Sequence, residues 1–362
     1  TEARKVQNAE TVESLLESAG SEVFRLTEVG GPRSHAWGMK QNVLEVLRQA
    51  EAAKTSGTGL IGVGSGIPDL DDLLSGFQKS DLIILGARPS MGKTSLLLNF
   101  AQVIAARHLG REAGGCPVGV FSLEMNAVQL TQRLLSNVTN INTQDLGSGK
   151  ISDGDLQRLV AGGSKVQSLP LYLDDTPALT LAAFRSKARR MKRQHGIGLL
   201  LVDYLQLLRC PLKGDFNRVQ EISEITMGLK QIARELDVPV IAASQLSRQV
   251  ESRDNKRPLL SDLRESGSIE QDADVVMFQY REDYYLSKLL GAADESTAAT
   301  DADRRKLTEA RDRLQALKGI SELLVSKNRK GPTGTVKLMF DEVRTTFSSY
   351  SSRKGSSHAG GF

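Results

Sequence analysis

The stretch Asp81-Leu-Ile-Ile-Leu-Gly-Ala-Arg-Pro-Ser-Met-Gly-Lys-Thr-Ser95 decides the fold of this chain. It opens with apolar residues that do not alternate with polar ones, which is typical of a strand covered on both faces. Small residues, a lysine and a hydroxyl residue follow, and then a helical pattern begins. This order of strand, loop and helix predicts a phosphate-binding loop at Gly86–Ser95, because backbone N–H groups and the positive end of a helix attract phosphate.

The loop departs from the usual motif at one position. Counted back from Gly92, Lys93 and Thr94, the place of the first glycine is held by Ala87, and Gly86 precedes it. Small residues still let the backbone wrap around phosphates, with Lys93 at the β- and γ-phosphates of ATP and the Thr94 hydroxyl on Mg²⁺. The residues that we expect to bind the nucleotide are Ala87, Arg88, Pro89, Ser90, Met91, Gly92, Lys93, Thr94 and Ser95.

Further apolar runs alternate with helical stretches from about Gly66 to Phe347. The runs are Val118–Ser122, Gly198–Asp203, Val238–Ser244 and Asp274–Phe278. This succession predicts an α/β fold with a mostly parallel sheet flanked by helices. Two later runs, Ser321–Ser326 and Gly334–Phe340, predict a C-terminal antiparallel hairpin.

Polar residues at the ends of three predicted strands are candidates for catalysis, because ligands of open α/β folds bind at this edge of the sheet. Asp203 is suited to hold the hydration shell of Mg²⁺. Glu124, which strand order is expected to place beside the phosphate loop, could deprotonate the attacking water. Gln245 has a neutral amide that could sense the γ-phosphate. Taken alone, each could instead be a helix cap or a surface residue, and the phosphate loop favours the catalytic interpretation.

The stretch Leu246–Glu270 is rich in basic residues and in small hydrogen-bond donors. The basic residues are Arg248, Arg253, Lys256, Arg257 and Arg264, and the small donors are Ser261, Ser266 and Gly267. This composition suits contacts to a sugar–phosphate backbone. A solvated charged loop would have the same composition, so composition alone leaves both interpretations open.

The basic run Lys327–Lys330 lies at the tip of the predicted hairpin. Its place in the chain is far from the phosphate loop, so contact with that loop of the same chain is not expected. In a ring it could reach the next subunit and act as a trans arginine finger. A solvated hairpin tip is the plainer alternative.

Composition excludes several classes of protein. The chain has 362 residues, of which 40% are hydrophobic and 25% charged, so whole-chain disorder is excluded. No apolar run approaches the roughly 18 to 20 residues that cross a bilayer. The sequence does not open with a basic and then apolar leader, so secretion is not expected. Cys116 and Cys210 cannot frame a disulfide scaffold, and we expect buried thiols in a reducing cytoplasm. The net charge of +4 is too small to identify a nucleic-acid partner.

The ends of the chain differ from its centre. An amphipathic helix at Val12–Leu26 is predicted to dock on a neighbouring copy, since an isolated helix of this length is marginal in water. A second helix is expected from about Lys40 to Ala53, followed by a linker at Thr55–Gly66 with five glycines. We therefore predict a helical linker region at 1–58, an ATPase domain at 59–347 and a disordered Ser- and Gly-rich tail at 348–362. Within the domain, the charged insert 286–318 is predicted to contain a surface helix at Asp301–Lys318.

Together these motifs resemble the replicative DNA helicases of the DnaB type, whose ATPase domain is RecA-like. The resemblance spans about residues 60 to 347. The residues that carry it are Ala87–Thr94, Phe121–Met125, Val202–Gln206, Ser261–Gly267, Ile269–Asp274 and Lys327–Arg329 before Gly331 and Pro332.

The resemblance implies a homohexameric ring that encircles single-stranded DNA and moves 5′ to 3′ on ATP hydrolysis, unwinding the duplex at the replication fork. It also implies a role for each matching residue. Lys93 and Thr94 would bind nucleotide and Mg²⁺, Glu124 would be the catalytic base, Asp203 the metal-side carboxylate and Gln245 the γ-phosphate sensor. Lys327 and Arg329 would act across the subunit interface, and the loop of Arg264, Glu265, Ser266 and Gly267 would contact DNA.

Two departures from the family limit what the resemblance implies. The helical N-terminal domain that collars the ring and binds primase has no counterpart in these residues, so a helicase loader and primase are expected partners of a full-length protein only. The insert 286–318 is longer than is usual in the family.

Two other classes share a RecA-like core, namely strand-exchange filaments and regulatory switches gated by ATP. The loop from Arg264 to Gly267 and the linker helix favour the helicase.

Overall fold

The computed structural model describes residues 38–56, 59–210, 218–263, 267–292 and 301–350. Contacts divide the chain into two units, Thr1–Ala52 and Ala53–Phe362. Helix α2 (Met39–Ser56) confirms the predicted second helix and extends it to Ser56. The amphipathic helix predicted at Val12–Leu26 lies outside the described residues.

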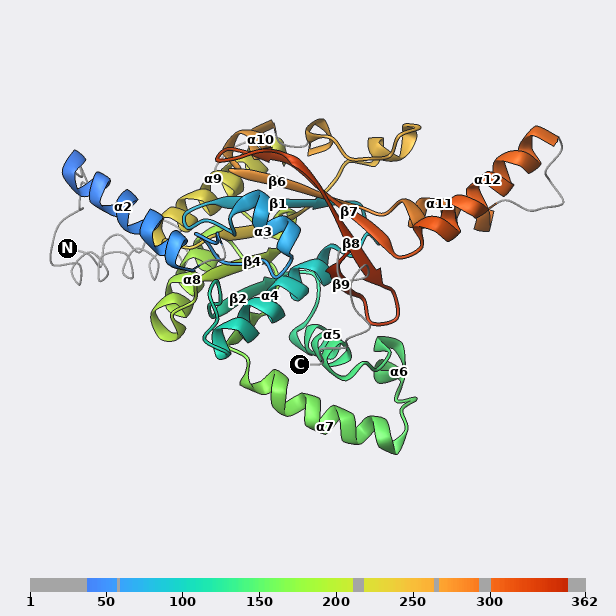
Figure 1. Cartoon of the computed structure of the whole chain (residues 1–362), viewed down its shortest axis with the longest axis horizontal. Coiled ribbons are helices and arrows are strands. Elements are labelled where there is room, and N and C mark those ends of the chain that lie inside the picture. The colour runs from blue at the N-terminus through green and yellow to red at the C-terminus, as the bar shows by residue number, and fades with distance from the viewer. Residues whose placement is uncertain (1–37, 57–58, 211–217, 264–266, 293–300, 351–362) are drawn as a thin grey trace, which may run out of the picture. The chain divides into compact units, whose positions relative to one another are not determined.

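A nine-stranded sheet runs through the second unit in the order β3-β2-β4-β5-β1-β6-β7-β8-β9 (Figure 1). The strands from β1 to β6 pair in parallel, and β6 to β9 pair antiparallel. The strands are β1 (Leu82–Ala87), β2 (Val118–Ser122), β3 (Leu171–Asp174), β4 (Leu199–Asp203), β5 (Val240–Gln245), β6 (Val275–Tyr280), β7 (Ile320–Asn328), β8 (Gly334–Asp341) and β9 (Thr346–Ser349). The predicted mostly parallel α/β sheet with a C-terminal antiparallel hairpin is confirmed.

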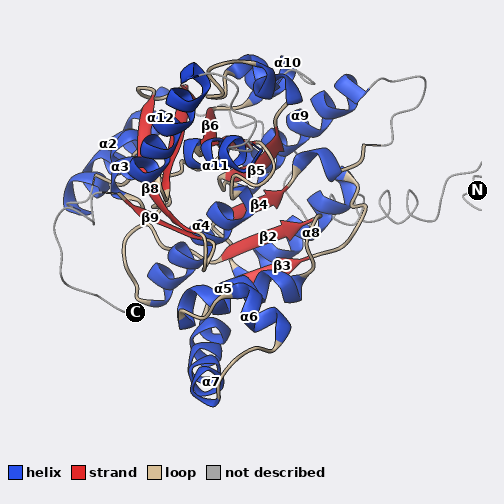
Figure 2. Cartoon of the chain, turned by 90° about the vertical axis from the view of Figure 1, so that its right-hand side faces the viewer, coloured by secondary structure: helices blue, strands red, loops and turns tan. Residues whose placement is uncertain are grey.

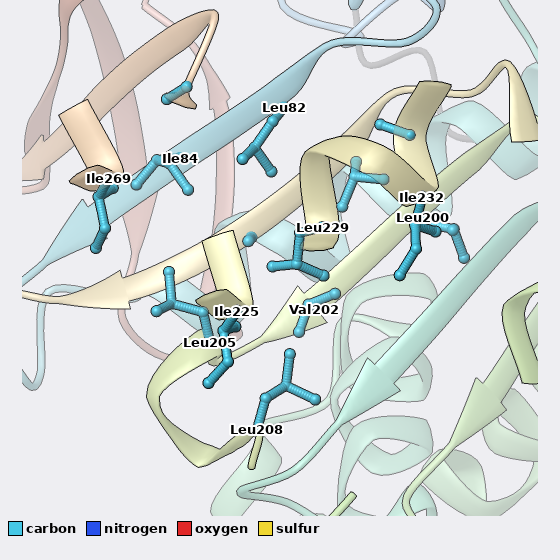
Figure 3. Packing of buried hydrophobic residues seen from close by; sticks show 14 of the residues in the cluster. Leu82, Ile84, Leu200, Val202, Leu205, Leu208, Ile225, Leu229, Ile232 and Ile269 are labelled. Carbon is cyan, nitrogen blue, oxygen red and sulfur yellow. The ribbon is translucent and has the colours of Figure 1, made fainter. Parts of the chain in front are cut away.

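Helices cover both faces of this sheet (Figure 2). The helices that follow α2 in the described residues are α3 (Pro68–Leu74), α4 (Lys93–Leu109), α5 (Ala127–Thr139), α6 (Thr143–Ser148), α7 (Asp153–Ser168), α8 (Leu181–His195), α9 (Arg218–Leu236), α10 (Gly267–Asp272), α11 (Glu282–Ala292) and α12 (Asp301–Leu317). Leu82 and Ile84 of β1 belong to the same buried cluster as Leu229 of α9 (Figure 3). Ile83 and Leu85 join the cluster beneath α4 on the other face. Two-sided burial therefore explains the apolar run that does not alternate.

Two short strands were not predicted. β3 has four residues, all half-buried at the edge of the sheet, so neither length nor apolar pattern marks it. β9 includes Ser348 and Ser349, so the predicted disordered tail at 348–362 is wrong for these two residues. It forms because Phe347 is buried against Phe340, with 4.6 Å between ring centroids. The remaining tail, residues 351–362, lies outside the described residues.

The predicted glycine linker is wrong for residues 59–66, which are a packed part of the second unit. Val63 and Phe77 exchange backbone hydrogen bonds of 2.9 and 2.7 Å, and Gly64 donates to Gly114 O at 3.0 Å. A Cβ atom on Gly62 would lie 2.3 Å from Phe77 O, so this glycine permits close backbone approach.

The charged insert forms two helices that project from the end of β6 (Figure 1). α12 confirms the surface helix predicted at Asp301–Lys318, whereas α11 was not predicted. None of the helices in the described ranges is long and apolar enough to cross a membrane. Cys116 and Cys210 are both free thiols, as expected, but they are half-buried and not fully buried as predicted.

Candidate active site

The carboxyl edge of the parallel strands brings four predicted groups to one side of the sheet. Ala87 at the end of β1 pairs with Gln245 at the end of β5, and Ser122 at the end of β2 pairs with Asp203 at the end of β4. Glu124 follows β2 by two residues, and the phosphate loop follows β1. The predicted common edge is therefore confirmed.

The backbone of the phosphate loop has the left-handed conformations that a tight anion-binding turn needs. Ser90 has a φ of 68° and Gly92 a φ of 88°. A Cβ atom on Gly92 would also lie 2.9 Å from the Phe347 ring. Glycine is therefore required at this position both for its positive φ and for the close approach of Phe347.

The Arg88 side chain is turned away from the place of the phosphates. Its Nη1 donates to Leu246 O at 2.7 Å, and its Nε and Nη2 donate to Glu251 at 2.9 and 2.8 Å. The side chain is buried and lowers the pKa of Glu251 through these hydrogen bonds. Of the predicted nucleotide contacts, Arg88 can therefore offer only its backbone, while its guanidinium anchors the loop.

Lys93, Thr94 and Asp203 form the centre of the site. The Thr94 hydroxyl donates to Asp203 Oδ2 at 2.5 Å, and Lys93 Nζ lies 3.5 Å from Asp203 Oδ1. Lys93 Nζ also lies 4.2 Å from the centroid of the Tyr204 ring, a cation–π contact. Tyr204 was not predicted as a site residue, although it stands next to Asp203 in the motif. Burial lowers the pKa of Lys93, and Asp203 and Glu124 oppose that shift.

The oxygen atoms at this centre suit a nucleotide-bound Mg²⁺. Asp203 is 2% exposed, and within the described residues its Oδ1 accepts no hydrogen bond and has only Lys93 Nζ, at 3.5 Å, as an ionic partner. A buried carboxylate oxygen without a donor is costly unless a ligand satisfies it. The described residues hold no cluster of three or more His, Cys, Asp or Glu side chains that could form an all-protein metal cage. Mg²⁺ needs only one or two protein ligands beside phosphate and water, so Thr94 and Asp203 fit it.

Glu124 reaches this centre, but not for the reason that strand order suggested. β2 is separated from β1 by β4 and β5, so the prediction that strand order places Glu124 beside the phosphate loop is wrong. Lys93 and Tyr204 nevertheless interact electrostatically with Glu124. Its carboxylate is exposed, as a group that must meet water needs to be.

Arg133 of α5 is a further charged residue at this edge, and the sequence did not single it out. Burial lowers the pKa of its guanidinium, and Asp203 and then Glu124 oppose the shift. The signal was present, because α5 starts three residues after Glu124 and Arg133 lies between the buried Leu130 and Leu134 on the packed side of that helix.

Gln206 links the ends of β4 and β5. Its Nε2 donates to Ser244 Oγ at 3.0 Å and to Gln245 O at 3.2 Å, and Gln245 N donates to Gln206 Oε1 at 3.3 Å. The Gln245 side chain remains exposed at the edge. Gln206 was part of the motif Val202–Gln206 but had no predicted role.

Lys327 and Arg329 lie at the opposite edge of the sheet. Asn328 pairs with Val275, and Val275 pairs with Ile83 near the start of β1, so the hairpin tip adjoins the amino ends of the strands. Lys327 is still in β7, and the turn proper begins at Arg329. The expectation that these cations do not reach the phosphate loop of their own chain agrees with this placement.

The predicted DNA-contacting loop is described only in part. Arg264, Glu265 and Ser266 lie outside the described residues, and Gly267 opens α10. Two basic residues that suggested a backbone-binding loop have internal carboxylate partners. Arg253 donates to Asp262 at 2.6 Å and Arg257 to Glu322 at 2.8 Å, so both stabilise the fold and weaken the argument from composition.

The chain is similar in sequence to a family of known helicases. Residues 62–349 match the DnaB-like helicase C-terminal domain family. The chain is 45% identical over 338 residues to the replicative DNA helicase DnaB of Rickettsia bellii (strain RML369-C), covering 92% of this chain and 66% of that protein. It is 40% identical over 333 residues to the replicative DNA helicase DnaB of Geobacillus stearothermophilus, covering 91% and 65%. The chain thus spans about two thirds of the length of these relatives.

A solved structure is also similar over most of the chain. It is a DnaB-like replicative helicase, described with its interactions with primase, and it has a TM-score of 0.73 and 32% identity. The similarity covers 92% of this chain and 71% of that one.

Proposed function

Because the chain belongs to the DnaB-like helicase C-terminal domain family, we propose that it is the ATP-hydrolysing motor of a replicative DNA helicase. The observation that carries this proposal is the buried Asp203 carboxylate, which accepts a hydrogen bond from Thr94 through one oxygen and has only the phosphate-loop lysine, Lys93, 3.5 Å from the other. Such a centre, beside a phosphate loop and an exposed glutamate, suits phosphoryl transfer from ATP to water.

The phosphate loop binds the nucleotide through its backbone, and Lys93 neutralises the β- and γ-phosphates. In the structure Lys93 is held by Asp203 and Tyr204. A triphosphate supplies more negative charge in the same buried space, so the lysine exchanges one anionic partner for another. Thr94 and Asp203 would hold Mg²⁺, which would neutralise the negative charge that develops on the phosphates.

Hydrolysis needs a base and a sensor at the same edge. Glu124 takes a proton from the attacking water, and its exposure gives water access to it. Gln245 hydrogen-bonds the γ-phosphate. When that phosphate leaves, the movement of Gln245 is transmitted to the end of β4 through the hydrogen bonds between Gln245 and Gln206.

The ring completes the site. We place Lys327 and Arg329 at the nucleotide of the next subunit of a homohexamer, which requires a heterologous, closing interface. The linker helix predicted within 1–58 would dock on a neighbouring copy. Single-stranded DNA contacts the loop of Arg264, Glu265, Ser266 and Gly267 through its phosphates. A loader and primase are partners of the full-length protein, as the primase interaction of a similar helicase suggests.

The test is ATP-dependent unwinding of a forked duplex with a 5′ single-stranded tail. Wild type is expected to unwind this substrate, and not a fork with only a 3′ tail, whereas Lys93→Ala is inactive on both. Electron microscopy with ATP is expected to show closed rings. Open helical filaments that pair homologous strands without unwinding would instead identify a strand-exchange protein, and ATP hydrolysis indifferent to DNA would identify a regulatory switch.

A further inference from the structure

The two cations of the hairpin, Lys327 and Arg329, have partners in the structure even without a neighbouring subunit. Lys327 Nζ donates to Ala273 O at 2.7 Å and also to Glu270 O. Arg329 Nη2 donates to Gln271 O. These acceptors are backbone carbonyls at and just beyond the C-terminal end of α10, where a helix exposes unpaired, partly negative oxygens. In Figure 1 the hairpin tip lies beside α10.

Asp274 joins this cluster to the sheet. Arg329 N donates to Asp274 O at 2.9 Å, and Arg329 Nη1 lies 3.4 Å from Asp274 Oδ1. The other oxygen, Oδ2, accepts from Leu82 N at 2.8 Å and from Lys230 Nζ of α9. The carboxylate is therefore fixed from two sides by β1 and α9. A buried carboxylate fixed in this way holds Arg329 in one place relative to the sheet.

A second carboxylate, Asp272, faces the same two cations. Its Oδ2 is buried and has no hydrogen-bond partner within the described residues. Burial raises the pKa of Asp272, and the charges of Arg329 and Lys327 oppose that rise. Both cations thus lie in the field of Asp272, and a modest shift of α10 could bring a donor to the free oxygen.

We propose that α10 and Asp274 form a seat that positions Lys327 and Arg329, and that α10 couples DNA contact at Gly267 to hydrolysis in the neighbouring subunit. α10 has six residues, with Gly267 at one end and the seat carbonyls at the other. A helix this short moves as one piece, so displacement of its first residue displaces the cations that rest on its last turn. The inference rests on the proposed function, because it takes Lys327 and Arg329 to act on a neighbouring nucleotide.

The chain offers a matched control carboxylate. Asp81 adjoins the start of β1 at the same edge, is 4% exposed against 6% for Asp274, and also has a lysine partner. Lys330 Nζ donates to both Asp81 oxygens, at 2.8 and 2.9 Å. The side chain of Asp81 does not contact Lys327 or Arg329 in the described structure. Asp81 also lies 4.0 Å from Lys230, the lysine that pairs with Asp274. Asp81→Asn therefore removes a comparable buried charge next to the seat, while every contact of Lys327 and Arg329 with α10 and Asp274 is kept.

The first measurement is steady-state ATP hydrolysis with and without oligo-dT. Asp274→Asn keeps the shape of the side chain and is expected to lower the DNA-stimulated kcat by about 10- to 100-fold, with KM for ATP within about two-fold. Asp81→Asn is expected to leave kcat unchanged, and the melting temperatures of both variants show whether each is folded. Equal loss of kcat in both variants would overturn the proposal. Should Asp274→Asn not fold, Asp272→Asn tests the same seat, with a smaller loss of kcat expected.

Mixed rings separate this inference from the proposed function. Mixing Lys93→Ala with Arg329→Ala subunits is expected to restore part of the hydrolysis, because some wild-type loops then face wild-type fingers. Asp274→Asn is expected to complement Lys93→Ala in the same way, but not Arg329→Ala, since both of those defects lie on the finger side of a shared site. Failure of the first pair, with mixed rings confirmed by native mass spectrometry, would refute the trans assignment itself. Rescue of the first pair alone, or rescue of Asp274→Asn by Arg329→Ala, would overturn only the seat.

Discussion

The two edges of one sheet hold charged residues in opposite states. At the carboxyl edge, buried Asp203 Oδ1 has no hydrogen-bond donor in the described structure and only Lys93 Nζ, at 3.5 Å, as an ionic partner, and Glu124 is exposed. At the amino edge, Asp81 is paired with Lys330, and Asp274 with Lys230 and Arg329. Buried charges persist only when they are paired or when a ligand completes them. The first edge is therefore built to receive a ligand, and the second is built to hold cations in place.

The largest expected effect tests this contrast with one lysine from each edge. Lys93→Ala is expected to abolish ATP hydrolysis and to weaken nucleotide binding strongly, because the lysine charge neutralises the β- and γ-phosphates. Lys330→Ala removes a lysine whose ammonium pairs with the buried Asp81 carboxylate, and it should hydrolyse ATP at the wild-type rate. Phosphate release and titration with a fluorescent nucleotide measure the two effects. If both variants lose binding alike, the contrast between the edges does not hold.

The second effect separates binding from chemistry within the carboxyl edge. Glu124→Gln is expected to bind ATP as tightly as wild type but to lose hydrolysis by roughly 10²- to 10⁴-fold, because an amide cannot accept the proton of the attacking water. Single-turnover phosphate release, alongside an equilibrium binding measurement, checks this. Hydrolysis at the wild-type rate would show that Glu124 is not the base and would leave Asp203 as the only carboxylate assigned to this edge.

How much could be predicted from the sequence also differs between the edges. The carboxyl-edge residues follow strands directly, and parallel strands end at a common edge, so Asp203, Glu124 and Gln245 could be placed together from local pattern alone. The strand order that separates β2 from β1 is set by tertiary packing and could not be read. Arg133 was missed although it lies on α5 close in sequence to Glu124, because its first charged partner, Asp203, comes from the distant strand β4.

The amino edge could hardly be predicted at all. Asp274 and Arg329 are 55 residues apart, and their contact depends on the antiparallel register of β6 and β7. Lys230 comes from a third element, α9. The same limitation explains Arg253 and Arg257, for which composition left DNA contact and a solvated loop both open, and which pair with carboxylates of the fold. Composition counts charges, whereas pairing in space decides which of them are available.

The third prediction concerns Arg88, the exception at the carboxyl edge, because its charge is already paired with Glu251. Arg88→Ala is expected to raise KM for ATP about ten-fold with a smaller change in kcat, since it loosens the loop without removing a phosphate contact. Glu251→Gln, which weakens the same anchor from the other side, should shift KM in the same direction. A large fall in kcat for Arg88→Ala with no change for Glu251→Gln would show that Arg88 contacts phosphate directly.

The smallest expected effect is a pH dependence at the amino edge. Burial raises the pKa of Asp81, and its pairing with Lys330 opposes that rise without cancelling it. A carboxyl whose pKa is higher in the folded than in the unfolded state favours folding when protonated, so its contribution is present at low pH and is lost as pH rises through the folded pKa. Asp81→Asn cannot titrate. The melting temperature of wild type, relative to that of Asp81→Asn, should therefore increase by roughly one to two degrees between pH 7 and pH 4. Calorimetry of both proteins across this range measures the melting temperature of wild type minus that of Asp81→Asn. A decrease of this value as the pH falls would mean that the Lys330 pair outweighs burial at this edge.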